Sequence, residues 1–218
     1  MNSEAIRRRH YPEKNMKIVV LGATGRTGRL LVQRALDHGH ALTAVVRSAG
    51  AIEPRECLNA AIADPLQAES LAALFVSHDA VISCLGQKSA ADAQLLRAAA
   101  SATLNAMART GVRRYLVVSQ GLLFPSRNPI ILLLRLILAR HVADSMAMEK
   151  LVSASDAEWT IVRPPRLLEG GAPRGYRIEI GAEPKGPWSM QRADLAAYLL
   201  DEVEKREHVR TIIGITSN

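Results

Sequence analysis

Three regularly spaced glycines are the residues of this sequence best suited to chemistry. Gly22, Gly25 and Gly28 lie between a β-branched run, residues 17–21, and a segment with apolar residues at helical spacing, residues 29–38. A diphosphate at a helix N-terminus needs a tight turn, a position without a Cβ where the phosphates approach, and a small residue where helix and strand pack. The spacing is GxxGxxG, and its strand-to-helix context predicts a dinucleotide-binding turn.

The residues after the second predicted strand, 41–46, distinguish the two nicotinamide dinucleotides. An acidic residue there would bond the ribose 2′-hydroxyl, whereas a cation would favour a 2′-phosphate. Arg47 and Ser48 follow this strand, and Arg26 in the glycine turn could add a second cation. We therefore expect NADP(H) to be preferred and NAD(H) to remain an alternative, although Arg47 could also be a solvated loop cation. Asp64 could contact the adenine edge, cap the next helix, or do both.

The elements that position these residues alternate along the chain. After the first strand and helix we predict strands at residues 41–46, 58–62, 80–84, 115–119, 159–163, 176–180 and 210–215, and helices at 65–75, 91–110 and 191–203. Strands that alternate with helices pair in parallel through right-handed crossovers, so helices should cover both faces of the sheet.

The predicted fold class is therefore α/β, a single doubly wound Rossmann domain with a mostly parallel sheet. It would span residues 16–218, after a mobile basic tail at residues 1–15. We expect the substrate side to be formed by segments around residues 121–150 and 165–190.

Composition narrows the function classes. The chain has 218 residues, 48% apolar and 22% charged, which suits one packed domain and excludes a disordered chain. Cys57 and Cys84 form no CxxC pair, so we expect no metal site, no disulfide framework and a reducing, cytoplasmic compartment. The net charge of +7 would permit nucleic-acid binding, but the 4% of aromatic residues are scattered, so a nucleic-acid partner is not expected. The expected assembly is a monomer or a homodimer.

One segment departs from the α/β pattern. Residues 129–139 are apolar almost all round, but the segment is short and contains Arg135, so we expect no transmembrane segment here. We favour a buried helix or loop under the substrate side of the sheet. A hydrophobic substrate wall, a dimer face and a membrane-surface anchor are the alternatives.

Several motifs together resemble the atypical short-chain dehydrogenases, most closely the NAD(P)H-binding group of NmrA-like proteins and biliverdin-IXβ/flavin reductases. The motifs are VLGATGRTG, VVR, ADP, SCLG, VS at the end of the fifth strand, TIVRPP and RADLA. The resemblance spans residues 16–215. Together with the glycine turn it implies cofactor contacts from Gly22, Thr24, Gly25, Arg26, Thr27, Gly28, Arg47, Ser48, Asp64, Leu85, Gly86, Ser119 and Pro164.

The sequence departs from this family at the proton donor. Many short-chain dehydrogenases use a Tyr-x-x-x-Lys pair, but Met146 stands four residues before Lys150. Arg166 holds the place after the Pro164-Pro165 corner where the flavin reductase type commonly has histidine. Candidate catalytic residues are therefore Ser119 and Gln120, as hydrogen-bond partners of an acceptor, and Arg166, which could hold an anionic group or a carbonyl.

Four neighbouring polar residues could also project toward the site. They are His141, Asp144, Ser145 and Glu149, and we interpret each as a solvated helix residue.

These residues support three hypotheses. The first is an NADPH-dependent oxidoreductase that transfers a hydride to a flavin, a quinone or a similar conjugated acceptor, since such acceptors need no dedicated proton donor. The second is a non-catalytic NADP(H)-binding redox sensor with a protein partner. The third is an enzyme like the sugar-nucleotide epimerases and dehydratases, for which the chain lacks the usual C-terminal substrate domain.

Overall fold

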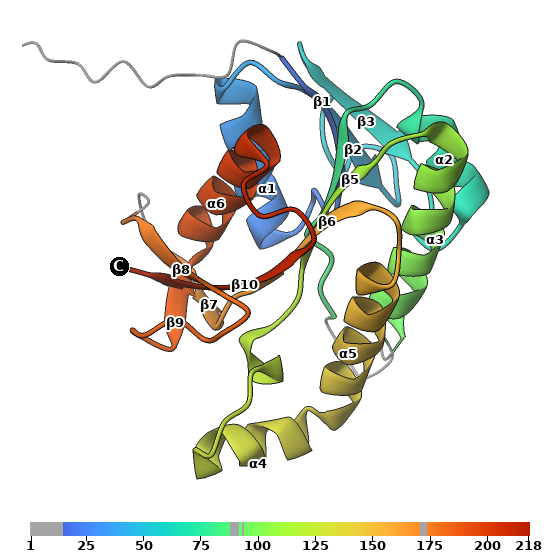
Figure 1. Cartoon of the computed structure of the whole chain (residues 1–218). Coiled ribbons are helices and arrows are strands. Elements are labelled where there is room, and N and C mark those ends of the chain that lie inside the picture. Colours follow the sequence, from blue (N-terminus) through green and yellow to red (C-terminus); the bar gives the residue numbers. More distant parts are fainter. Residues whose placement is uncertain (1–14, 88–91, 93, 171–173) are drawn as a thin grey trace, which may run out of the picture.

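The structure is a computed structural model (Figure 1), and it describes residues 15–87, 92, 94–170 and 174–218. Except for Asn15, the predicted basic tail lies outside the described residues. None of the described helices has the length and apolar character needed to cross a membrane.

The main sheet has eight strands in the order β3-β2-β1-β4-β5-β6-β10-β8. The strands are β1 (Lys17–Leu21), β2 (Ala41–Val46), β3 (Leu58–Ile62), β4 (Ala80–Ser83), β5 (Arg114–Val118), β6 (Glu158–Arg163), β8 (Tyr176–Ile180) and β10 (Thr211–Ser217). All neighbours pair in parallel except β8, which runs antiparallel to β10 at one edge. The order 3-2-1-4-5-6 is that of a doubly wound dinucleotide-binding fold, as predicted.

Helices cover both faces of this sheet (Figure 1). They are α1 (Arg26–Asp37), α2 (Ala68–Phe75), α3 (Leu95–Thr110), α4 (Pro129–Ile137), α5 (Ala139–Ser153), α6 (Arg192–Lys205) and the 3₁₀ turn η2 (Gly121–Leu123). Helices α1 and α6 pack together on one face, and α2, α3 and α5 line the other. A separate two-stranded sheet, β7 (Arg166–Leu168) with β9 (Ser189–Gln191), was not predicted.

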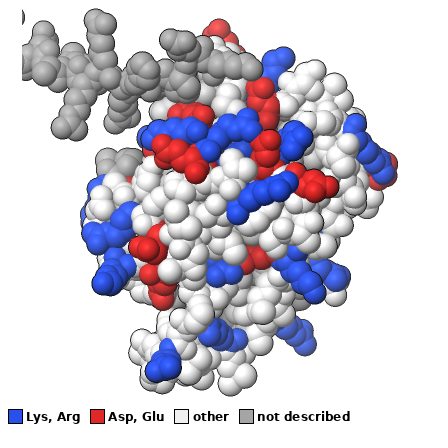
Figure 2. Space-filling view, viewed as in Figure 1, with Lys and Arg blue, Asp and Glu red and all other residues white. Residues whose placement is uncertain are grey.

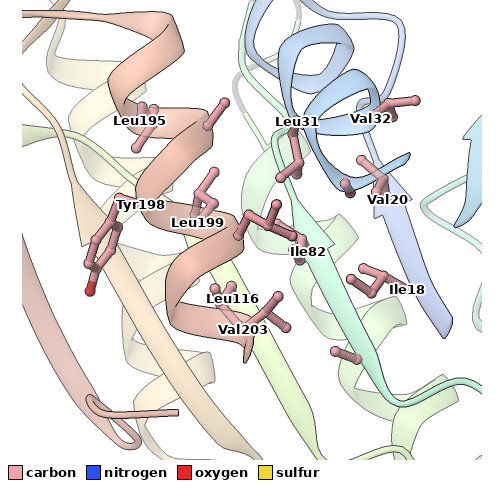
Figure 3. Close-up of a cluster of buried hydrophobic side chains, with 14 of the residues drawn as sticks. Ile18, Val20, Leu31, Val32, Ile82, Leu116, Leu195, Tyr198, Leu199 and Val203 are labelled. Carbon is pink, nitrogen blue, oxygen red and sulfur yellow. The ribbon is translucent and has the colours of Figure 1, made fainter. Parts of the chain in front are cut away.

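Two apolar cores form between the sheet and these helix layers. On one face Leu31 and Leu199 project from the helices toward Val20, Ile82 and the neighbouring strands (Figure 3). The other core packs α2, α3 and α5 against the opposite side of the same strands. Because the central strands are buried on both faces, their sequences are almost continuously apolar.

Most element boundaries lie within a few residues of the predicted ones, and the differences occur at helix starts. Helix α1 begins at Arg26, three residues earlier than expected, with Gly25 at its N-cap. Helix α2 begins only at Ala68, and its N-cap is Gln67. The Asp64 carboxylate instead accepts from the Leu66 N–H at 2.9 Å, which closes a local turn, so the expectation that Asp64 caps this helix is wrong.

The expectation of a buried segment at residues 129–139 is also wrong. The segment forms α4 and the start of α5, but no residue of α4 is buried. Asn128 caps the helix by accepting from the Ile130 N–H at 2.9 Å, and Pro129 occupies the first turn. The helix lies outside both core layers, so its apolar composition does not reflect burial in the core.

Asp144 on α5 caps a different helix. Its carboxylate, which is buried, accepts from the Leu96 and Arg97 N–H groups at 2.9 and 3.0 Å and from the Gln87 amide at 2.6 Å. These N–H groups belong to the first turn of α3, whose own N-cap, Gln94, makes no side-chain cap. Asp144 therefore joins α5 to α3, and its interpretation as a solvated residue is wrong.

We predict that Asp144→Asn lowers the free energy of unfolding by about 1–2 kcal/mol, because it removes the charge that faces the positive end of α3. Urea unfolding followed by circular dichroism measures this. Asp37→Asn is the control, since Asp37 is exposed and accepts only from Gln33 among the bonds of the described residues. Equal losses in both variants would contradict the capping role.

Candidate dinucleotide-binding site

The glycine turn joins β1 to α1 through close backbone contacts. Gly22 has φ +74°, and a Cβ there would lie 2.8 Å from the Cys84 carbonyl group. A Cβ at Gly28 would lie 2.2 Å from the Gly22 carbonyl oxygen. Both contacts are too short for any side chain, so Gly22 and Gly28 let the N-terminus of α1 sit directly on the ends of β1 and β4.

The N-terminus of α1 is suited to an anion. Gly25 provides no side-chain cap, and the first turn contains no acidic residue. The early N–H groups of the helix therefore have no carboxylate or hydroxyl acceptor from the cap, and the helix dipole favours negative charge there. A diphosphate would meet both needs, so these residues fit the cofactor that the sequence predicts.

An open cavity of about 140 Å³ lies next to this turn. It brings together six of the predicted cofactor residues, Gly22, Thr24, Gly25, Arg47, Leu85 and Gly86, with Val45, Val46, Ala63, Pro65, Cys84, Asp92 and Leu95. The lining comes from the carboxyl ends of β1 to β4, which is where ligands bind in open α/β sheets. Burial raises the pKa of Cys84 to about 12, so its thiol lines the cavity as a neutral group.

Cations gather around the turn. Arg47 is exposed at the end of β2 and lines the cavity. Arg26 pairs with Glu169 at 2.5 Å, and Arg192 donates to the hydroxyl of Thr27 at 3.3 Å. Burial and the nearby charge of Arg26 lower the pKa of Arg192. An anion at the turn would relieve this repulsion between cations.

The other predicted cofactor residues do not line this cavity. Thr27 and Gly28 are buried in the first turn of α1, and Ser48 directly follows Arg47. Asp64 stands between two lining residues, Ala63 and Pro65. Ser119 and Pro164 follow the carboxyl ends of β5 and β6.

Ser119 takes part in a buried ionic network. Its hydroxyl donates to Glu149 on α5 at 2.6 Å, and the same carboxylate pairs with Arg163 at the end of β6 through contacts of 3.0 and 2.5 Å. Glu149 is buried and the Arg163 side chain is 14% exposed, so the two charges compensate each other away from bulk water. The guanidinium also lies over the Phe124 ring, 4.7 Å from its centre.

Gln120 is held in a similar way. Its amide donates to the Ser145 hydroxyl at 2.7 Å and to the His141 carbonyl at 3.2 Å, both on α5. Ser145 is buried. The chain after β5 is thus tied to α5 by two adjacent side chains, Ser119 and Gln120.

A second, much smaller cavity of about 20 Å³, enough for about one water molecule, follows the ends of β5 and β6. Phe124, Arg163, Pro165 and Trp188 contribute to its lining. Arg166, the predicted holder of an anionic group, is exposed on β7 and is not part of this lining.

Sequence reasoning missed Glu149 and Arg163. Glu149 was interpreted as solvated, and this is wrong because it is buried against β6. A signal was present in the strand EWTIVR, because it ends on a charged residue and none of the other described parallel strands does. Arg163 pairs with Glu149, which lies fourteen residues earlier on a helix, and local spacing in the sequence does not predict this pairing.

One group among the described residues has the composition of a metal site. Glu204 Oε1 lies 3.0 Å from His38 Nδ1 and 2.8 Å from His40 Nε2. The Met16 N–H donates to His40 Nδ1 at 3.2 Å, which makes this nitrogen an acceptor and places the ring proton on Nε2. Nε2 then donates to Glu204 and has no lone pair for a metal, so the group acts as a hydrogen-bond network between α1 and α6.

The fold and the glycine turn together define a dinucleotide-binding Rossmann protein. A sequence profile of the NAD(P)H-binding family matches residues 22–206, and the chain therefore belongs to this family. The Bacillus subtilis protein YwnB is 25% identical over 205 residues, which cover 88% of this chain and 94% of YwnB.

Solved structures are similar over nearly the whole fold. The oxidoreductase ylbE from Lactococcus lactis has a TM-score of 0.80 at 18% identity, and the match covers 93% of this chain and 91% of ylbE. SP1627 from Streptococcus pneumoniae, a proposed NADH-flavin reductase, has a TM-score of 0.75 at 22% identity, with 94% of this chain and all of SP1627 covered. These structures confirm the predicted fold class, and the family match confirms the predicted resemblance.

We predict that Glu149→Gln lowers the free energy of unfolding by about 2–4 kcal/mol, because Arg163 then keeps its charge in a poorly solvated place without a carboxylate. Thermal and urea unfolding measure the loss. Glu179→Gln is the control, since Glu179 is exposed on β8. If Glu149→Gln has the same free energy of unfolding as the wild type, the network does not hold α5 to β6.

Proposed function

We propose that the protein is an NADPH-dependent oxidoreductase that reduces a flavin, a quinone or a similarly conjugated small molecule. The observation that carries the proposal is the cavity beside the glycine turn, with Arg47 at its edge. Bound NADPH would supply a hydride, and a conjugated acceptor spreads the resulting charge over its own rings. The protein has then to bind and align the two partners.

The preference for NADPH rests on the cations near the adenosine side of the cavity. Arg47 follows β2 at the position where an acidic residue would repel a 2′-phosphate, and Ser48 adds a hydroxyl donor. No acidic residue follows β2 before Glu53. A guanidinium can hold a phosphate by two parallel hydrogen bonds, which a ribose hydroxyl does not offer.

We place the acceptor at the segments around residues 121–150 and 165–190. The smaller cavity draws its lining from both segments, including the aromatic rings of Phe124 and Trp188. Such rings suit a flat conjugated molecule. Because the cavity holds only about 20 Å³ in this conformation, the acceptor would enter as these side chains move apart. Ser119, Gln120 and Arg166 remain the predicted polar contacts of the acceptor, and the name given to SP1627 favours a flavin.

The helix that would carry a tyrosine proton donor supports an acceptor of this class. Met146, four residues before Lys150 on α5, is 58% exposed, and a thioether cannot donate a proton. Two of the buried polar residues of α5, Ser145 and Glu149, already bond Gln120 and Ser119. An acceptor that can be protonated by solvent fits these residues better than a simple ketone.

The same contacts favour a second candidate function, a non-catalytic NADP(H)-binding redox sensor. The Ser119 hydroxyl and the Gln120 amide both donate to partners within the protein. Either group could donate to a substrate only after its side chain leaves that partner. A sensor would need the cofactor site and no acceptor site. Turnover distinguishes the two functions.

We predict that Arg47→Ala weakens NADPH binding by about tenfold to a hundredfold, because one charge-assisted contact to the 2′-phosphate is lost, while NADH binding changes little. Calorimetric titration of both cofactors tests this. Arg109→Ala, an exposed arginine of α3 paired with Glu69, is the matched control. Equal weakening of NADH and NADPH would overturn the assignment of Arg47 to the 2′-phosphate.

We predict that the purified protein oxidises NADPH faster when FMN, a water-soluble benzoquinone or a naphthoquinone is present, as followed by the absorbance of the reduced nicotinamide. Simple ketones should give no turnover because the tyrosine is missing. Tight NADPH binding without turnover on any flavin, quinone or dicarbonyl would reject the reductase. In that case a protein partner captured in only one cofactor redox state would support the sensor.

A further inference from the structure

The outer face of α4 is apolar and exposed. Ile130, Leu133 and Ile137, spaced as one face of a helix, are 67%, 57% and 67% exposed, and Leu132 and Leu136 beside them are 48% and 74% exposed. A helix on the surface of a water-soluble domain normally carries polar residues on this face. Five large aliphatic side chains on one nine-residue helix form a contiguous patch that marks an interaction surface.

The opposite face of α4 attaches the helix to the protein. Ile131 and Leu134 are half-buried on this side. Arg135, also on this side, donates from Nε to the Leu122 carbonyl at 2.7 Å and from a terminal nitrogen to the Phe124 carbonyl. Its charge is thus directed inward at the loop after β5. The outer aliphatic residues are presented on a helix that is held in place, away from both cores (Figure 1).

The exposed charged residues that flank α4 in the sequence are positive. No aspartate or glutamate occurs between Asp92 and Asp144, and Asp144 is buried at the end of α3. Arg127 before α4 and Arg140 after it are exposed. The end of the molecule that carries α4 shows blue and white surface without red in the view of Figure 2, while acidic and basic side chains mix elsewhere on that face.

We propose that α4 docks on the surface of an anionic lipid bilayer. Aliphatic residues on the outer face would enter the boundary between headgroups and acyl chains, and Arg127 and Arg140 would meet the lipid phosphates. With nine residues, α4 is about 13 Å long, which is enough to lie in this boundary and too short to cross it.

The charges argue for a bilayer over a second copy of the chain. In a twofold dimer through α4, Arg127 and Arg140 of one copy would lie beside the same arginines or the apolar patch of the other copy. Residues 93–143 contain no acidic residue that could pair with them. An anionic membrane supplies both an apolar layer and a dense layer of negative charge. This inference does not depend on the proposed function.

Vesicle sedimentation tests the proposal with the full chain. We expect binding to vesicles of phosphatidylcholine mixed with phosphatidylglycerol, weaker binding at high salt, and little binding to phosphatidylcholine alone. The triple variant Ile130→Ser, Leu133→Ser, Ile137→Ser should reduce the bound fraction at least about tenfold, since three buried aliphatic groups are lost. These side chains are exposed, so the variant should keep the wild-type melting temperature.

A matched control distinguishes binding through the α4 patch from binding through any exposed aliphatic side chains. Ile62, Val76 and Ile180 are 63%, 59% and 64% exposed on other elements, and their triple substitution by serine should leave vesicle binding unchanged. A second control is Arg7→Gln, Arg8→Gln, Arg9→Gln, because the basic N-terminal sequence could bind anionic lipid by charge alone. If this variant abolishes binding and the α4 variant does not, the proposal is overturned.

Tryptophan fluorescence can detect the binding of α4 to lipid directly, without relying on a variant that loses binding. Leu136→Trp places an indole on the most exposed position of the patch, and its emission should shift to the blue with anionic vesicles and be quenched by brominated acyl chains. Unchanged emission would overturn the proposal. So would light scattering that shows a dimer in the wild type and a monomer in the α4 variant, with equal vesicle binding by both.

Discussion

The close approach of the first helix to the first strand is the constraint on which the rest of the site depends. Gly28 lies so near the Gly22 carbonyl that any side chain would collide with it, and Gly22 packs equally closely on the chain after β4. These contacts place the N-terminus of α1 at the carboxyl edge of the sheet, beside the cavity and next to Arg47. A small displacement of α1 would remove the anion site, the cavity wall and part of the α1–α6 core together.

Two buried ion pairs hold the later helices on opposite faces of the sheet, at opposite ends of the neighbouring strands β5 and β6. Arg163 ends β6 and pairs with Glu149 of α5, whereas Arg114 begins β5 and pairs with Glu202 of α6 at 2.6 Å, with both side chains 1% exposed. Burying such charges is costly, and replacement by apolar residues is often neutral, so these pairs are poor evidence for stability. Each can be satisfied only in one alignment of helix and strand. We interpret them as contacts that specify where α5 and α6 sit, which in turn fixes the position of Ser119.

The segment between β5 and α5 connects the interior to the surface. The loop after Ser119 and Gln120 contributes Phe124 to the smaller cavity, and its carbonyl groups accept from Arg135 of α4. The same short stretch therefore contains residues of the proposed acceptor side and carries the exposed aliphatic helix. A partner bound at α4 would contact an element that is bonded directly to the loop lining the cavity.

The alternation of strands and helices, the parallel sheet and the glycine turn follow from the sequence alone, because local apolar periodicity and the spacing of Gly22, Gly25 and Gly28 are enough to specify them. Arg47 was predicted as a cofactor residue from its position after a strand, and it lines the cavity beside the glycine turn. The tertiary structure decided the partners of Asp144, Glu149 and Arg163, since a buried charge is satisfied by residues distant in sequence. It also decided that residues 129–137 lie outside the core, because an apolar composition is the same for a helix inside the protein and for one that faces a partner.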